Sequence, residues 1–282
     1  MCQRRHLENR LPSPSAVRAR CLAWVLLGLF AGCKSTAIDA NLPRAHQIVQ
    51  NQLIIKSDFH LSPRNRLIRE LEREGEEIQK LLALPRCLNP IEVHLFDDEE
   101  AYREVMRREF PAFPERRALF VKQGDDLLVY AFWGKRIGED LRHEITHGYL
   151  HALIPEMPLW LDEGLAEFFE LGYEREGLHK GHLRMLAKSY QEGTWRPNLQ
   201  RLESLWDAAA MTQMDYAESW LWVHFLLQST PENRQLLRDQ LARLRMSPDV
   251  PPISSYLQGE TNSPVDAVLV DHLLSLAEPD QA

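Results

Sequence analysis

Two histidines and a glutamate form the segment with the clearest chemistry in this sequence. The segment is His143-Glu144-Ile145-Thr146-His147, in which the second histidine comes four positions after the first. On a helix this spacing puts both imidazoles on one face, about one turn apart, so both can reach one metal ion. The carboxylate of Glu144 can then reach a water on that metal. We therefore expect one Zn²⁺ ion in a hydrolytic site, with Glu144 as the general base.

A third metal ligand has to come from a later segment. His151 extends the four-residue series, but a third ligand on the same straight helix lies too far along the axis, so we expect a rim or structural role. Pro155 then ends this helix. A second helix, expected from Trp160 to Leu171, offers two carboxylates, Glu163 and Glu167. From the residues alone, both remain candidates for the third ligand.

One class of zinc enzyme is excluded by the residues after His147. Metzincins need a glycine three residues, and a third histidine six residues, after the second histidine. Those two positions are Leu150 and Leu153 in this chain.

The metal helix together with Trp-Leu-Asp-Glu-Gly-Leu-Ala-Glu at 160–167 resembles the gluzincins, the thermolysin- and aminopeptidase-like peptidase MA superfamily. The resemblance implies that Glu163 is the third zinc ligand and that Glu167 holds a ligand histidine by its other ring nitrogen. The connection between His147 and Glu163 is shorter than in thermolysin. The Gly-x-Met-x-Asn strand of the aminopeptidases is missing, so the resemblance does not extend to aminopeptidase specificity.

The resemblance also implies a hydrogen-bond donor for the oxyanion, which gluzincins supply as a Tyr or His from the helical part. Tyr216 is our candidate because it follows a loop near the start of a helix, although a tyrosine packed at a helix end would have the same pattern. His224, eight residues later, is the other candidate, but a histidine among apolar neighbours is more typical of a core.

Hydrophobic periodicity predicts an α+β fold. A small mixed α/β N-terminal lobe, residues 51–136, is expected to lead into a mainly helical lobe, residues 137–277. The resemblance implies a thermolysin-like metal helix at their junction. Strands are expected at 52–59, 91–96, 118–122 and 126–132, and helices at 65–84, 97–109, 139–153, 160–171, 182–191, 198–209, 215–228, 231–245 and 265–277.

Two further expectations concern substrate binding. The strand 126–132, the second strand of a predicted hairpin, is expected to be the edge of the cleft that pairs with an extended peptide. Eight aromatic residues could line an apolar pocket, but their helical or strand spacing favours a core. They are Phe132, Trp133, Trp160, Phe168, Phe169, Trp220, Trp222 and Phe225.

The amino terminus has the pattern of a bacterial lipoprotein. Residues 1–32 combine arginines, a short apolar run and small residues before Cys33, which predicts a signal peptide with a lipobox. Phe30 stands where a lipobox usually has an aliphatic residue. We expect Cys33 to be lipidated, residues 33–50 to form a tether, and the protein to be anchored to a membrane of the bacterial cell envelope, facing the periplasm or the exterior.

Charge and cysteine content restrict the partners. The chain has a net charge of −8, and the first 32 residues contain five arginines and one glutamate, so the remainder carries −12. Such an acidic chain without a basic stripe argues against nucleic acid as a partner. After Cys33 the one remaining cysteine is Cys87, so no disulfide is expected within the mature chain.

These observations lead to a principal functional hypothesis and two rivals. The principal one is a zinc metallopeptidase, most simply an endopeptidase acting on a protein or peptide substrate. A non-catalytic zinc-binding envelope lipoprotein is the first rival, and zinc hydrolysis of a non-peptide substrate is the second. The intact Glu144 favours catalysis, because a scaffold needs the metal ligands but not the base.

Overall fold

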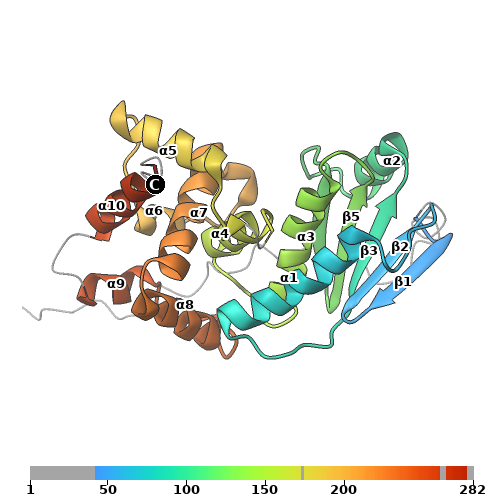
Figure 1. The fold of residues 1–282 in the computed structure, drawn as a ribbon, viewed down its shortest axis with the longest axis horizontal. Helices are drawn as coiled ribbons and strands as arrows, with labels where there is room; N and C mark the ends of the chain where they lie inside the picture. The colour runs from blue at the N-terminus through green and yellow to red at the C-terminus, as the bar shows by residue number, and fades with distance from the viewer. Residues whose placement is uncertain (1–41, 173–174, 261–264, 278–282) are drawn as a thin grey trace, which may run out of the picture. The chain divides into compact units, whose positions relative to one another are not determined.

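The computed structural model describes residues 42–172, 175–260 and 265–277, which form a mixed α/β fold (Figure 1). The predicted signal peptide, the lipidation residue Cys33 and the first part of the tether lie outside these residues. The strands are β1 (His46–Gln50), β2 (Leu53–Ser57), β3 (Ile91–Phe96), β4 (Ala118–Gln123) and β5 (Asp126–Phe132). The α-helices are α1 (Arg66–Leu82), α2 (Glu99–Glu109), α3 (Ile137–His151), α4 (Leu159–Phe169), α5 (Lys180–Gln191), α6 (Leu199–Glu203), α7 (Gln213–Gln228), α8 (Pro231–Leu244), α9 (Ser254–Glu260) and α10 (Val265–Ala277).

The strands form one sheet in the order β1-β2-β3-β5-β4. β2, β3 and β5 are parallel, while β1 and β4 run antiparallel at the two edges. The predicted hairpin is present, but its inner strand is β5 and its edge strand is β4. The expectation that residues 126–132 form the free edge is therefore wrong. Side chains on both faces of β5 are buried, as in an inner strand. β4 ends in the exposed Lys122 and Gln123, as an edge strand can.

The two faces of the sheet are covered by different helices. On one face, Tyr102 and Val105 of α2 pack with Phe96 and Tyr130 of the sheet. On the other face, α1 and α3 share the main core with β3 and β5, and α3 contacts β3, β4 and β5. The helix with the metal-binding motif therefore lies directly against the strands next to the free edge.

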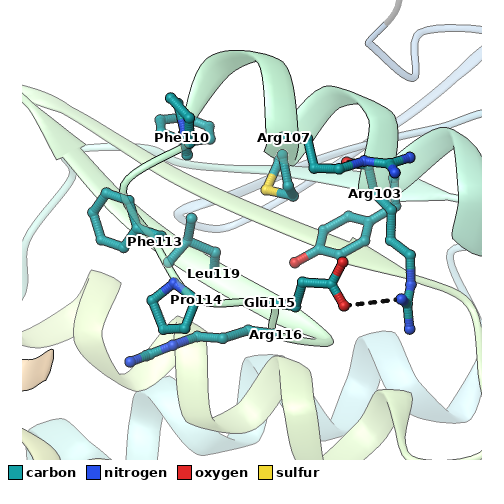
Figure 2. Close-up of a pocket in the computed structure, with 11 residues that line it drawn as sticks. Arg103, Arg107, Phe110, Phe113, Pro114, Glu115, Arg116 and Leu119 are labelled. Carbon is teal, nitrogen blue, oxygen red and sulfur yellow. Dashed lines mark hydrogen bonds and ion pairs between the residues drawn. The ribbon is translucent and has the colours of Figure 1, made fainter.

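A pocket of about 190 Å³ lies on the α2 side of the sheet (Figure 2). It lies between α2 and residues 110–116, the segment that leads into β4. Leu119 of β4 also lines it, so the pocket adjoins the free edge strand.

The helices after α3 pack around α7, which contacts α4, α5, α8 and α10. Twelve of its sixteen residues are buried, including Trp220 and Trp222. A glycine permits the closest of these contacts: a Cβ on Gly164 of α4 would lie 2.6 Å from the carbonyl oxygen of Ser219. Because real Cβ atoms do not approach backbone that closely, Gly164 sets how near α4 lies to α7.

Most of the aromatic residues that the sequence assigned to a core are buried. Trp160, Trp220 and Trp222 are fully buried, and Phe168, Phe169 and Phe225 are nearly so. Phe132 is only partly buried, and Trp133 has 38% of its surface exposed and packs edge-on against Phe59.

Three elements differ from the expected pattern. β1 falls within residues 33–50, so that part of the expected tether belongs to the sheet. The helix expected at 198–209 is two short pieces, α6 and a 3₁₀ turn at Ala208–Ala210. α9 lies in a segment where no element was expected. The described residues contain no helix that is long and apolar enough to cross a membrane.

A buried carboxyl group lies between α1 and α3. Glu74 of α1 is 4% exposed, and its Oε1 accepts a hydrogen bond of 2.9 Å from the hydroxyl of Thr146 on α3. Its Oε2 is buried and has no hydrogen-bond partner. Burial raises the pKa of Glu74 well above its usual value of 4.5. The carboxyl group therefore favours its neutral form in the folded chain.

We predict that Glu74→Gln stabilises the protein increasingly as the pH rises. Below the ordinary pKa of 4.5 the carboxyl is neutral in both the folded and the unfolded chain, so the substitution changes little. As the pH rises above that value, the unfolded chain ionises Glu74 freely and the folded chain does so at a cost. Glutamine keeps the acceptor for Thr146 and cannot ionise.

Thermal unfolding of both proteins at pH 4 and pH 8 tests this. The gain in Tm should appear mainly at pH 8, at roughly 2–4 °C for each kcal/mol in a domain of this size. An equal difference between the two proteins at both pH values would contradict the prediction.

Candidate metal centre

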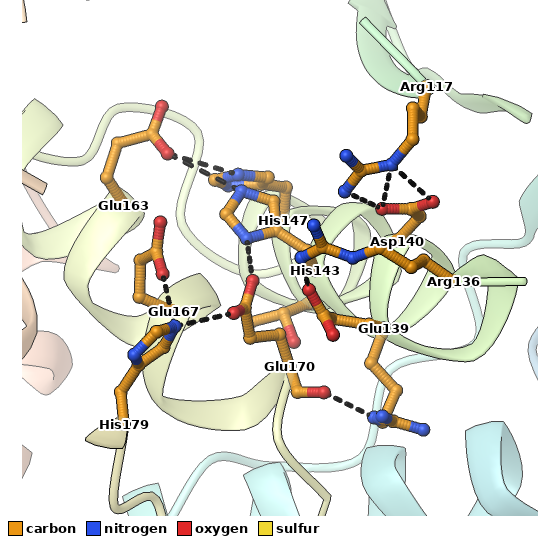
Figure 3. Close-up of polar contacts among 12 residues, drawn as sticks. Arg117, Arg136, Glu139, Asp140, His143, His147, Glu163, Glu167, Glu170 and His179 are labelled. Carbon is orange, nitrogen blue, oxygen red and sulfur yellow. Dashed lines mark hydrogen bonds and ion pairs between the residues drawn. The ribbon is translucent and has the colours of Figure 1, made fainter. Parts of the chain in front are cut away.

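The three predicted ligands meet between α3 and α4 (Figure 3). His143 and His147 project from one face of α3, as their spacing predicts. Oε2 of Glu163, from the first turns of α4, lies 3.6 Å from Nε2 of His143 and 3.8 Å from Nε2 of His147. The ligand atoms of all three residues lie within 4.8 Å of one another.

The distances in this group fit a shared cation better than direct hydrogen bonds. Hydrogen bonds from nitrogen to oxygen are usually 2.7–3.2 Å long, whereas tetrahedral zinc with bonds of about 2.0–2.2 Å separates its ligand atoms by roughly 3.3–3.6 Å. Oε2 of Glu163 is buried and has no hydrogen-bond partner. A buried carboxylate oxygen without a partner is costly, and a cation between it and the two imidazoles would remove that cost.

Asp162 holds the second ligand histidine. Its two carboxylate oxygens lie 2.9 Å from Nδ1 of His147 and 2.8 Å from Nε2 of His151. Burial alone would raise the pKa of Asp162, but the two histidines outweigh it and hold the pKa far below its usual range. An ionised Asp162 fixes the proton of His147 on Nδ1, which leaves Nε2 free to bind the metal. His151 thus has the structural role expected of it.

Glu170 holds the first ligand histidine, and this corrects the role expected for Glu167. Oε2 of Glu170 lies 3.0 Å from Nδ1 of His143. Glu167 instead lies 2.8 Å from Nε2 of His182 on α5. Glu167 lies on α4 four residues after Glu163, and Glu170 is the residue that caps the end of α4. The hydrogen bond to the imidazole of His143 comes from Glu170.

A further histidine, His179, contacts the other carboxylate oxygen of Glu170. His179 caps α5, and its Nδ1 accepts a hydrogen bond of 3.1 Å from the backbone N–H of His182. A ring nitrogen that accepts has no proton, so the neutral imidazole of His179 carries its proton on Nε2. That Nε2 lies 3.4 Å from Oε1 of Glu170 (Figure 3). Glu170 can thus accept from His179 with one oxygen and from His143 with the other.

The residues Glu167, His179 and His182 also lie close together, with rings of the two histidines stacked 3.7 Å apart. Their geometry differs from that of the first group. Glu167 and His182 are at hydrogen-bond distance, and Nε2 of His179 has a proton where a metal would need a lone pair. We therefore interpret this second group as a hydrogen-bonded support for α5.

The electrostatics of the site favour a cation. Burial alone would lower the pKa of His143, yet the nearby carboxylates of Glu163 and Glu170 raise it well above 6.5. The pKa of His147 is raised as well, because the charge of Asp162 outweighs burial. The raised pKa values of these two buried imidazoles indicate that the surrounding carboxylates favour a positive charge at this place. A divalent metal ion would supply positive charge at this place.

Glu144 lies at the junction of the metal helix and the free edge strand. It is 8% exposed, and its Oε2 accepts a hydrogen bond of 2.7 Å from the backbone N–H of Phe120 in β4. The ring of Phe120 stacks against the rings of His147 and His151. The free edge of β4 and the expected general base are thus in direct contact.

The two candidates for the oxyanion donor have different surroundings. Tyr216 lies in the first turns of α7, which a reciprocal capping box of Thr212 and Asp215 fixes. Its pKa is raised by burial and then by the charge of Glu163, while the Arg116 guanidinium beside it acts in the opposite direction. Its hydroxyl is therefore near the metal ligands.

His224 has no such contact with the metal ligands among the described residues. Its Nδ1 lies 2.9 Å from Nε2 of His272, and its ring packs against Trp220 and Phe168. Burial lowers the pKa of His224 to about 3. It is a core histidine, as its neighbours in the sequence favoured.

Comparison with known proteins supplies no family for this chain: no family model matches it, and no curated protein matches it.

The sequence reasoning missed Asp162, Glu170 and His179. Asp162 had a signal, because it directly precedes the ligand Glu163 and shares the first turn of α4. Glu170 also had one, since a position seven residues after Glu163 returns to the same helix face. His179 had none, because its place depends on how α5 packs.

The structure predicts that the two glutamates that were candidates for the third ligand differ in their effect on zinc affinity. Glu163→Ala removes a ligand and should weaken zinc binding by more than about 100-fold, the upper end of the loss for an outer hydrogen-bond partner. Glu167→Ala should leave zinc binding close to that of the wild type, because Glu167 contacts His182 instead. Competition with a chromophoric chelator measures both affinities. Loss of zinc in Glu167→Ala with retention in Glu163→Ala would reverse the assignment.

We also predict that His179→Asn weakens zinc binding about three- to tenfold without destabilising α5. Asparagine is among the best helix caps, so it keeps the acceptor for the N–H of His182. It lacks the ring Nε2–H that reaches Glu170, and Glu170 would then hold His143 less firmly. The chelator competition and thermal unfolding of the metal-free protein measure the two properties separately.

His179→Ala is the matched control, because it removes both the cap and the donor and should lower both. Equal zinc affinity in the wild type and His179→Asn would remove His179 from the support of the site.

Proposed function

We propose that this chain is a zinc-dependent metallopeptidase, most simply an endopeptidase. The observation behind the proposal is the buried Oε2 of Glu163, which has no hydrogen-bond partner and faces Nε2 of both His143 and His147. The adjacent Glu144 supports catalysis over simple metal storage, because a storage site has no use for a carboxylate in the position of a base.

In the proposed mechanism, each residue has a task that its contacts suit. Zinc, when bound, lowers the pKa of a water and polarises the substrate carbonyl. Glu144 would accept a proton from the water whose oxygen bonds to the carbonyl carbon, and would deliver that proton to the amine nitrogen as the C–N bond breaks. Asp162 and Glu170 keep the protons of the two ligand imidazoles on Nδ1. Tyr216 donates a hydrogen bond to the oxyanion that forms at the carbonyl.

The finer arrangement and the location of the protein belong to the same proposal. The sheet with its covering helices would correspond to the N-terminal lobe of a gluzincin, and the helices around α7 to its helical lobe, with α3 as the thermolysin-like metal helix between them. The lipobox pattern before Cys33 supports attachment to a membrane of the cell envelope. An anchored enzyme of this kind would act on proteins or peptides outside the cytoplasm.

Glu144→Gln is expected to keep zinc and lose at least about 100-fold in kcat/KM, the lower range for general acid–base catalysis. Glutamine still accepts the hydrogen bond from the N–H of Phe120, so β4 and the metal helix should keep their contact. Metal analysis and a peptide-library cleavage assay on the full chain, each with wild type and variant, give both quantities.

Two outcomes would refute the peptidase. If both proteins bind zinc and neither cleaves any peptide, the non-catalytic zinc-binding lipoprotein becomes the better hypothesis. If Glu144→Gln cleaves peptides as fast as the wild type, the activity does not come from this site.

A further inference from the structure

The pocket beside the free edge strand is a candidate for substrate binding that the mechanism above does not use (Figure 2). Its lining is mainly apolar and comes from α2, from the segment before β4 and from β4 itself. Phe110 and Phe113 form one side of it, and Met106 and Leu119 also line it. Leu119 is buried, while Phe113 has 46% of its surface exposed, so the pocket is open to solvent at this residue.

The charged residues around this pocket largely neutralise one another. Arg103 pairs with Glu99 at 2.7 Å and with Glu115 at 3.0 Å, and Arg107 pairs with Glu100 at 2.6 Å. The remaining guanidinium, that of Arg116, lies beside the hydroxyl of Tyr216. With its arginines engaged in this way, the pocket suits a neutral apolar group better than a carboxylate.

Two lining residues connect the pocket to the metal centre. Leu119 lines the pocket and directly precedes Phe120, whose backbone N–H donates a hydrogen bond of 2.7 Å to Glu144. Arg116 lines the pocket and reaches Tyr216, the candidate oxyanion donor. The pocket therefore lies next to both groups expected to act on the substrate.

The register of β4 indicates which part of a substrate would enter the pocket. Leu119 is opposite Tyr130, on the face covered by α2, while Phe120 is opposite Val129, on the face of the metal helix. A peptide extended along the free edge of β4 would alternate in the same way. Its side chains on the α2 face would point toward Leu119 and the pocket.

We propose that this pocket is a specificity site for a large apolar side chain, preferably aromatic, of a substrate residue close to the cleaved bond. The proposal rests on the peptidase function proposed above. The volume of about 190 Å³ is adequate, because an apolar cavity of roughly 150 Å³ already binds benzene. Aromatic rings of Phe110 and Phe113 can pack against a guest ring edge-on or offset.

The test uses zinc-loaded full chain and quenched fluorogenic peptides that are identical except for one residue, Phe or Ala, at each position flanking the cleaved bond. At one position, kcat/KM should favour Phe by about tenfold, the gain for partial burial of a large apolar side chain. Phe113→Ala should reduce this preference to about threefold or less. Because Phe113 is half exposed, its truncation should not unfold the protein.

The matched control is Leu88→Ala, which truncates another exposed apolar side chain, in the loop between α1 and β3. This control should keep the full preference for Phe. If the wild type cleaves the peptides and Phe113→Ala keeps the full preference for Phe, the pocket is not a specificity site. The proposed peptidase function would be unaffected by that result.

A binding measurement separates failure of the pocket from failure of the peptidase. The same peptides are titrated into zinc-loaded Glu144→Gln and into the double variant with Phe113→Ala, with fluorescence anisotropy as the readout. If the wild type cleaves nothing, the peptidase fails. In that case, tighter binding of the Phe peptide that disappears in the double variant still supports the pocket, and equal binding of both peptides overturns it.

Discussion

Buried negative charge between α3 and α4 is the constraint on which this structure depends. Glu163, Asp162 and Glu170 bring their carboxylates within reach of two imidazoles, and the position of each is explained by the need to compensate that charge. Burying ionised carboxylates is costly unless they are paired or bind a metal. The raised pKa values of His143 and His147 show that these carboxylates favour positive charge in the site, and a divalent cation held by both histidines would supply it. Around such an ion, the two histidines, the three carboxylates and Glu144 would form one electrostatic unit.

The packing of one short helix gives this unit its geometry. All three carboxylates belong to α4 or the residue that follows it, and Gly164 lets α4 lie against the backbone of α7 at Ser219. Tyr216 belongs to α7, so the same contact that positions the third ligand also sets where the tyrosine hydroxyl lies.

Local patterns predicted the parts of the site that a single helix determines. His143, Glu144 and His147 needed only the period of α3, and Glu163 needed a motif at the start of α4. The choice between Glu167 and Glu170 required knowing where α5 packs, because both face the same side of α4. The edge strand was assigned wrongly for a related reason: chain order in a hairpin does not tell which strand joins the sheet. The signal for the correct assignment was the continuous apolar run of β5, which is typical of an inner strand, whereas β4 ends in polar residues.

The hydrogen bond between Glu144 and Phe120 has a consequence for self-association. An exposed edge strand presents unpaired N–H groups that can recruit a strand from another molecule, and proteins usually block such edges with charge, proline or bulges. Here a carboxylate from the neighbouring helix occupies one of these donors on β4. The N–H of Phe120 is therefore unavailable to a strand from another molecule at the point where β4 adjoins the candidate metal centre. A peptide that extends along this edge therefore has to bond to the other backbone groups of β4.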